Sequence, residues 1–197
     1  SLVLLFGLLF FTNFLFSQST EHGINHYRPS ATKINNLVHT KLDVRFDYDK
    51  QWLYGNAWIT LRPHFYNTDS LSLDAKGMDI KQVSIIKGNI KTPLQYKYDS
   101  SFINVKLDKS YKSNESYTVF IDYISKPNNL QAKGSAAITD AKGLYFINPK
   151  GEEKNKPTQI WTQGETEAAS VWFPTIDKPN QKTTQEIYMT VPSKYVT

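Results

Sequence analysis

The sequence of 197 residues contains no cysteine. This absence excludes disulfide bonds, thiolate metal sites, a cysteine nucleophile and a lipid-modified N-terminal cysteine. It leaves an exported location open, because many exported proteins fold without disulfides. A hydrophobic fraction of 40%, with 14% aromatic residues, is enough for a real core, so we expect a globular chain of one domain with a short appendage.

Arginine is also scarce, since Arg28, Arg45 and Arg62 are the only three, although the formal net charge is +5. The other cations are lysines scattered along the chain. Proteins that bind nucleic acids cluster their cations and favour arginine for its bidentate geometry. The charge pattern therefore predicts a solvated, lysine-rich surface and no nucleic-acid partner.

The sequence also lacks the common catalytic and cofactor-binding motifs. The sequence has no G-x-S-x-G elbow, no phosphate-binding glycine loop, no dinucleotide fingerprint and no HExxH helix. His22 and His26 have helical spacing, but Gly23 lies between them and Glu21 precedes the pair, so we interpret both as linker residues. His39 and His64 fall in or beside predicted strands and are expected at the surface. We therefore predict no metal site in this chain.

Long helical periodicity is absent, and alternation of apolar and polar residues takes its place. Between residues 38 and 48, the even positions Val38, Leu42, Val44, Phe46 and Tyr48 are mostly apolar, whereas the odd positions are all polar. This is the pattern of a strand with one buried face. "DKQW" then predicts a turn, and Leu53, Ala57, Ile59 and Leu61 predict the buried face of a hairpin partner.

Further short apolar runs follow at regular spacing: "LSLDA", "IKQVSIIK", "LQYKY", "FINVKL", "YTVFIDYI", "GLYFI", "TQIWTQ" and "EIYMTV". Turn-forming stretches such as "KGN" and "KSNES" separate them. The spacing predicts an all-β fold, either a β-sandwich or a large curved antiparallel sheet. Residues 126–142 are the longest irregular region and are expected to be mobile.

The opening residues predict export. Residues 2–16 are almost wholly apolar, yet they are too short and too interrupted by Thr12 and Asn13 for a stable membrane span. They fit the apolar region of a secretory signal, with a buried core helix as the alternative. We assign residues 1–18 to a partial signal peptide, 19–36 to a linker and 37–197 to the β domain. The abrupt end after a strand favours a cut C-terminus and a natural boundary equally.

One segment, "WTQGETEAASVWFPTIDKPN" from Trp161 to Asn180, breaks the alternation. Glu165 and Glu167 follow a glycine and precede an apolar run that ends at two prolines. From the residues alone, a pair of exposed loop carboxylates is the first interpretation, because charged side chains are usually solvated.

The same segment resembles the end of the N-terminal domain of the aminopeptidase N family of zinc metallopeptidases. That family has a T-Q-x-E or T-Q-x-Q loop, then an aromatic or aliphatic pair with proline, then Asp-x-Pro, a strand and "VP". The chain matches in order and without a gap at Gln163, Glu165, Phe173, Pro174, Asp177 and Pro179, followed by "EIYMTVP". The opening strands, with Gly55 in a hairpin and Leu73-Asp74 in a strand, extend the resemblance over residues 38–197. One departure is Ser170, where many members carry an arginine, and we expect it to affect local structure.

The resemblance implies a saddle-shaped β domain that packs on a thermolysin-like catalytic domain, with the T-Q-x-E loop reaching into the active site. By position, Glu165 would bind the free α-amino group of a peptide substrate and Gln163 would hydrogen-bond near its scissile end. Glu167 is expected to point elsewhere and stay solvated. The zinc and its ligands would belong to the catalytic domain of the full-length enzyme, so this chain alone would bind no zinc and cleave nothing.

Two alternatives remain open at this point. The first is a non-catalytic β module for binding or scaffolding, including a family relative without catalytic motifs. The second is a carbohydrate-binding sandwich, suggested by four tryptophans and twelve tyrosines. Aromatic residues in strands are more often part of the core.

Overall fold

The computed structural model describes residues 29–130 and 141–197. The predicted signal peptide, linker residues 19–28 with His22 and His26, and the centre of the predicted mobile region lie outside the described residues. Ala31–Thr197 form one compact unit. Within the described ranges, no helix is long and apolar enough to cross a membrane.

The described residues are almost entirely strands and loops, which confirms the predicted all-β fold. The strands are β1 (Asn35–Asp47), β2 (Trp52–Pro63), β3 (Thr68–Asp74), β4 (Met78–Lys87), β5 (Ile90–Pro93), β6 (Gln95–Tyr98), β7 (Phe102–Tyr111), β8 (Tyr117–Ser125), β9 (Leu144–Ile147), β10 (Gln159–Thr162) and β11 (Thr184–Thr190). Two short 3-10 turns, η2 (Pro127–Asn129) and η3 (Ala169–Val171), complete the elements. The sequence pattern did not predict β5, whose residues are all exposed.

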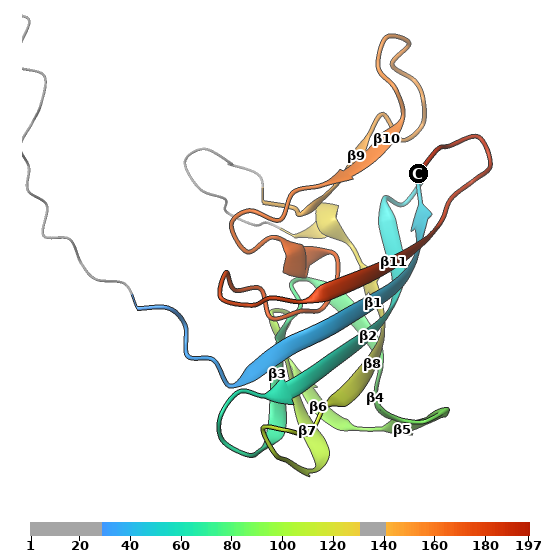
Figure 1. Cartoon of the computed structure of the whole chain (residues 1–197). Helices are drawn as coiled ribbons and strands as arrows, with labels where there is room; N and C mark the ends of the chain where they lie inside the picture. The colour runs from blue at the N-terminus through green and yellow to red at the C-terminus, as the bar shows by residue number, and fades with distance from the viewer. Residues whose placement is uncertain (1–28, 131–140) are drawn as a thin grey trace, which may run out of the picture. The chain divides into compact units, whose positions relative to one another are not determined.

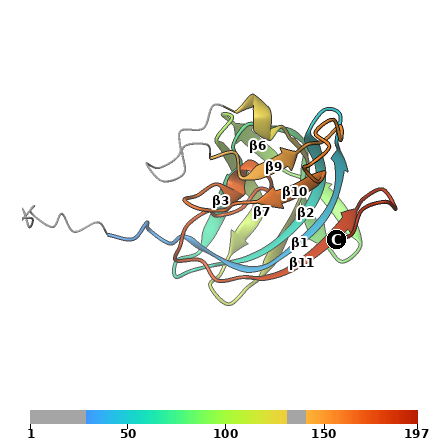
Figure 2. The same cartoon turned by 90° about the horizontal axis from the view of Figure 1, so that it is seen from above.

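The strands of the described residues form three sheets. The largest has the order β11-β1-β2-β8-β4-β5 and curves around the other elements, while β3-β7-β6 and β10-β9 form smaller sheets (Figures 1 and 2). All neighbouring strands are antiparallel except β1 and β11, which pair in parallel. A parallel pair requires a long connection, and here β2 to β10 lie between the two strands in sequence.

The first hairpin forms as predicted, with one correction. The buried face of β2 carries Leu53, Ala57, Ile59 and Leu61, as expected from the alternation. In β1 the register shifts between Leu37 and His39, so Val38 is 38% exposed instead of buried. A bulge inserts one extra residue, which moves the side chains beyond it to the opposite phase. β1 also begins at Asn35, inside the predicted linker.

The core lies between the six-stranded sheet and the three-stranded sheet. One cross-strand row of the large sheet joins Leu42, Ala57, Ile121 and Val83, all nearly inaccessible to solvent. Facing residues from β3 and β7 belong to the same hydrophobic cluster, including Leu71, Leu73, Ile103, Val105 and Leu107. Burial of such aliphatic side chains contributes about 1.5–3 kcal/mol each and is the main stabilising term of the fold.

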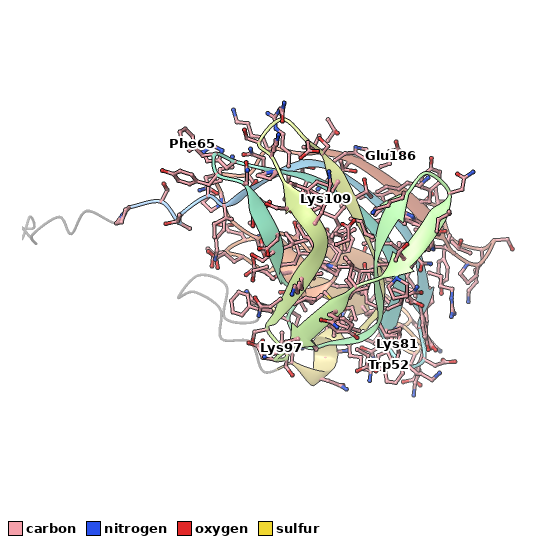
Figure 3. The ribbon with its side chains drawn as sticks, turned by 90° about the horizontal axis from the view of Figure 1, so that it is seen from below. Trp52, Phe65, Lys81, Lys97, Lys109 and Glu186 are labelled. Atoms are coloured by element: carbon pink, nitrogen blue, oxygen red, sulfur yellow. The ribbon has the colours of Figure 1, made fainter. Side chains whose placement is uncertain are left out.

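Lysines are spread over the surface of this unit. Figure 3 shows Lys97 on β6, Lys109 on β7 and Lys81 on β4 well apart from one another when the molecule is viewed from below. Two of these side chains have local partners: Lys109 pairs with Glu115 at 2.8 Å and Lys81 with Asp79 at 3.6 Å. The absence of a nucleic-acid partner stays a prediction.

Candidate functional site

The segment after β10 leaves the small β9-β10 hairpin, passes through η3 and returns to the edge of the large sheet as β11 (Figure 1). Its first part, Thr162 to Glu167, is exposed or half-buried, whereas the run from Ala168 to Thr175 is mostly buried. Ala168, Val171 and Phe173 are at most 5% exposed. The apolar run therefore fixes the base of a loop whose polar tip faces solvent.

Gly143 fixes the start of this loop. Its carbonyl accepts a 2.9 Å hydrogen bond from the Gln163 backbone N–H. Gly143 has a φ of +67°, and a Cβ at this position would lie 2.0 Å from the carbonyl oxygen of Ala168. Only glycine combines this backbone conformation with such a close approach. Gly143 therefore has a structural role in the site. The sequence motifs did not indicate this role.

Asp177 and Asp74 fix the end of the loop. The Asp177 Oδ2 atom accepts the backbone N–H of Ser170 at 2.9 Å, and the Asp177 N–H donates to Asp74 Oδ2 at 3.0 Å. Asp74 also forms an isolated β-bridge with Thr175. Ser170 is fully buried at the loop base. The expected effect of this departure from the family pattern on local structure stays a prediction.

A buried hydroxyl adds a further link to the large sheet. Ser125, at the end of β8, donates from Oγ to the carbonyl of Val171 in η3 at 2.7 Å. Both residues are almost inaccessible to solvent. The loop base is therefore tied to β3, β8 and the β9 region by separate hydrogen bonds.

Gln163 and Glu165 lie together at the tip. The Gln163 Nε2 atom donates to Glu165 Oε2 at 3.4 Å, at the long end of hydrogen-bond distance. Glu165 is exposed, and among the described residues its carboxylate has no cation within ion-pair distance. An exposed carboxylate beside an amide, held on a fixed loop, can bind an incoming cationic donor.

Glu167 is exposed, as expected, but its carboxylate is not free. Lys178 Nζ lies 2.8 Å from Glu167 Oε2, and the Lys76 ammonium donates to the Glu167 carbonyl. The pair with Glu167 raises the pKa of Lys178, and partial burial opposes this effect. Lys178 is therefore cationic at neutral pH. The sequence did not indicate either lysine as part of the site. Lys76 in particular is far from Glu167 along the chain, so their contact could not be predicted.

These groups surround one shallow depression on the surface. It is lined by Gly164, Glu165, Thr166, Glu167, Asp177, Lys178 and Pro179. Glu165 and Lys178 thus share a single solvent-filled space, although the ammonium pairs with Glu167.

A separate apolar groove runs between the β9-β10 hairpin and the edge formed by β1 and β11. Its lining includes Phe46, Tyr48, Trp161, Ile187, Met189 and Tyr195, and its volume is about 580 Å³. Trp161, Ile187 and Met189 are each more than 40% exposed, and Trp161 stacks on Tyr145 with ring centroids 4.5 Å apart. Exposed apolar surface of this kind is typical of sites that contact another molecule or domain.

Metal ligands do not gather anywhere in the described ranges: no group of three or more His, Asp or Glu side chains could hold a metal ion there. His39 bonds to Thr184 at 2.8 Å, and exposed His64 bonds to Asn36 at 3.1 Å, as expected for surface histidines. The described residues therefore offer zinc no ligand set.

Comparison with known families identifies the domain. A family profile described as "Peptidase M1 N-terminal domain" matches residues 25–197. The chain belongs to this family. This match confirms the resemblance to the N-terminal domain of a metallopeptidase family that was inferred from the T-Q-G-E loop.

Solved structures share the fold of this M1 domain. A two-domain M1 zinc metallopeptidase mutant bound to L-arginine matches with a TM-score of 0.66 and 13% identity, covering 85% of this chain and 35% of its own. The M1 zinc metallopeptidase from Deinococcus radiodurans gives 0.62 and 15%, with 85% and 35% coverage. Native yeast LTA4 hydrolase gives 0.58 and 23%, with 83% and 24% coverage.

The chain thus spans about a third or less of these structures. Among curated proteins, none matches it.

Proposed function

We propose that this chain is the N-terminal domain of an exported zinc aminopeptidase, in which Glu165 binds the free α-amino group of peptide substrates. The observation that carries the proposal is the contrast between two neighbouring acids. The Glu167 carboxylate pairs with Lys178 at 2.8 Å, whereas Glu165 has no cation within ion-pair distance in the described residues. A substrate ammonium would supply the missing charge.

The chemistry of the loop suits this role. A charge-assisted hydrogen bond between an ammonium and a carboxylate is about twice as strong as a neutral one. Packing of a second domain over the loop would lower the local dielectric and strengthen the pair. Gln163, anchored through its backbone N–H to Gly143, offers an amide to the substrate backbone near the scissile bond.

Zinc would be held by a thermolysin-like catalytic domain, since the described residues provide no ligand set. When bound there, zinc would activate the water that attacks the peptide carbonyl. In this division of labour, the residues of the present chain bind and orient the substrate. Without the other domain, the chain would be inactive.

The apolar groove beside β11 is the surface that we assign to packing on the catalytic domain. The groove is apolar, and its lining includes Trp161 and Thr162 at the end of β10, which lead directly into the loop that carries Glu165. Export of the full-length enzyme is part of the proposal and is supported by the apolar run at residues 2–16.

Two measurements test whether the full-length protein has a catalytic domain and whether it is exported. The gene read beyond Thr197 should encode HExxH with a following Glu, and its absence would favour a non-catalytic module. Cell fractionation should find the full-length enzyme outside the cytoplasm.

Substitution of Glu165 in the full-length enzyme tests the site. Glu165→Ala removes one partner of a desolvated ion pair, a loss of about 2–5 kcal/mol. At about 1.4 kcal/mol per factor of ten, kcat/KM for an aminoacyl anilide should fall between roughly thirty-fold and a few thousand-fold. Zinc content and thermal midpoint should stay unchanged. Glu165→Gln should be milder because it keeps an acceptor.

Asp69→Ala is the matched control, because Asp69 is an exposed acid at the start of β3, outside the loop and the groove. Its kcat/KM should equal that of the wild type. An N-acetylated anilide should be a poor substrate of the wild type, since it lacks the ammonium. Near-wild-type activity and selectivity of Glu165→Ala would refute the role of Glu165.

A further inference from the structure

Lys178 is a potential competitor of any substrate ammonium that binds Glu165. It is a resident cation in the depression that Glu165 lines, and its side chain is 29% exposed. A lysine side chain is a flexible stem of four methylene groups, so its ammonium can take up different positions within the depression. Its 2.8 Å ion pair with Glu167 holds it at that carboxylate, and the charges of Asp74 and Asp177 also act on it.

The backbone fixes Glu167 where it can hold this ammonium. Its N–H donates to the Gly164 carbonyl at 3.1 Å, and its own carbonyl accepts the ammonium of Lys76. Ser170 Oγ lies 3.5 Å from the same carbonyl. Glu167 adopts a φ of +81°, a backbone conformation that is uncommon for residues other than glycine.

The backbone of Lys178 is fixed as well. Its N–H donates to the Ile176 carbonyl at 2.9 Å, and the preceding Asp177 is held by Asp74 and Ser170. Both partners of the ion pair therefore start from anchored positions. The fold constrains where the Lys178 ammonium can go, and Glu165 and Glu167 both border its space.

We infer that Glu167 is a positioning residue that retains Lys178, so that the Glu165 carboxylate stays free for the substrate amine. This inference rests on the proposed function of Glu165. Without the Glu167 carboxylate, Lys178 would pair with Glu165 and compete with the substrate from within the chain. Glu167 thus acts on substrate binding through Lys178 and touches no substrate itself.

The size of the effect follows from the weakness of exposed ion pairs. Such pairs contribute at most about 1 kcal/mol, so an internal Lys178–Glu165 pair would raise KM roughly two- to five-fold. Because Lys178 would compete only for the free Glu165 carboxylate, kcat should change little. This pattern differs from that of Glu165→Ala, which removes the binding group altogether.

The experiment is a set of variants in the full-length enzyme, assayed with an aminoacyl anilide. Glu167→Ala should raise KM two- to five-fold, and Glu167→Gln should do the same, because both lose the charge that holds Lys178. The decisive variant is the double substitution Glu167→Ala with Lys178→Ala, in which KM should return to within about two-fold of the wild type. Asp69→Ala is again the control.

Restoration by a second substitution separates this inference from a structural role. If Glu167 only stabilised the loop, removal of Lys178 would leave KM raised or raise it further, and that result would overturn the inference. An unchanged KM in Glu167→Ala would overturn it as well. Thermal midpoints of all variants identify any loss of folding, which the double variant could not repair.

A third background distinguishes failure of this inference from failure of the proposed function. In Glu165→Ala, the further change Glu167→Ala should have no effect on KM, because the substrate-binding carboxylate for which Lys178 would compete is already absent. If Glu165→Ala itself is silent, the proposed function fails. If Glu165→Ala is impaired as expected and Glu167→Ala is silent, the role of Glu167 alone fails.

Discussion

Gly55 on β2 lies directly against the ring of Tyr123 on β8, its cross-strand partner. A Cβ on Gly55 would lie 2.3 Å from Cζ of Tyr123. Tyr123 is fully buried, so its ring has no free volume to move into. The glycine is what allows a large aromatic side chain to lie flat on the centre of the sheet.

Gly55→Ala should therefore destabilise the domain by about 1–3 kcal/mol through overpacking. Gly164→Ala is the matched control, since its Cβ would meet ordinary contact at 3.8 Å. Urea unfolding of both variants measures the difference. Combining Gly55→Ala with Tyr123→Leu should cost less than the sum of the two changes, because the shorter side chain vacates the site. Strict additivity would contradict the assigned contact.

Ser125→Ala should loosen the base of the candidate loop. It leaves the buried carbonyl of Val171 without its 2.7 Å donor, at a cost of about 1–3 kcal/mol in unfolding free energy. Ser72→Ala, an exposed serine on β3, should change stability by less than about 0.5 kcal/mol. Amide hydrogen exchange should show faster exchange in residues 169–173 of the first variant. Equal stability of the two variants would argue against the link.

Acid should destabilise the domain partly through Asp99. The backbone N–H groups of Phe102 and Ser101 donate to its carboxylate and lower its pKa below the ordinary 3.8. The stability from this group is therefore present above the ordinary pKa and is lost as pH falls through the lower pKa of the folded state. Asp99→Asn removes this titration.

The stability difference between wild type and Asp99→Asn should shrink as pH falls from about 5 to about 2. Urea unfolding at several pH values measures the trend for each protein. The other acids with lowered pKa values titrate in both proteins, so their contribution cancels in the difference. A difference that is independent of pH would show that Asp99 does not contribute in this way.

The isolated domain, expressed from Thr20 onward, should self-associate through its apolar groove. Met189 and Ile187 point into the groove from β11 and are more than 40% exposed. Met189→Lys should shift the domain toward monomer in sedimentation velocity, because the charge opposes burial. Tyr188→Lys is the control, since Tyr188 contacts Lys41 and does not line the groove. A monodisperse, highly soluble wild-type monomer would count against the groove as a packing surface.

Period-two alternation predicted most strands, since burial of one sheet face imposes the same alternation on side chains. It worked for Leu42 and Val44 in β1 and for Ile59 and Leu61 in β2. It missed β5, whose four residues are all exposed and so carry no alternation. It also misplaced Val38, because a bulge is a backbone event that the alternation of residues does not encode.

The sequence by itself determined the all-β class, the first hairpin and the order of the motif residues from Gln163 to Pro179, because each depends on neighbours along the chain. Only the tertiary structure decided that β11 pairs in parallel with β1 and that Lys178 pairs with Glu167, while Glu165 has no ion-pair partner among the described residues. It also placed Lys76, from the connection after β3, on the carbonyl of Glu167. These contacts depend on which distant segments of the chain the fold brings together in space, and separation along the sequence does not specify that.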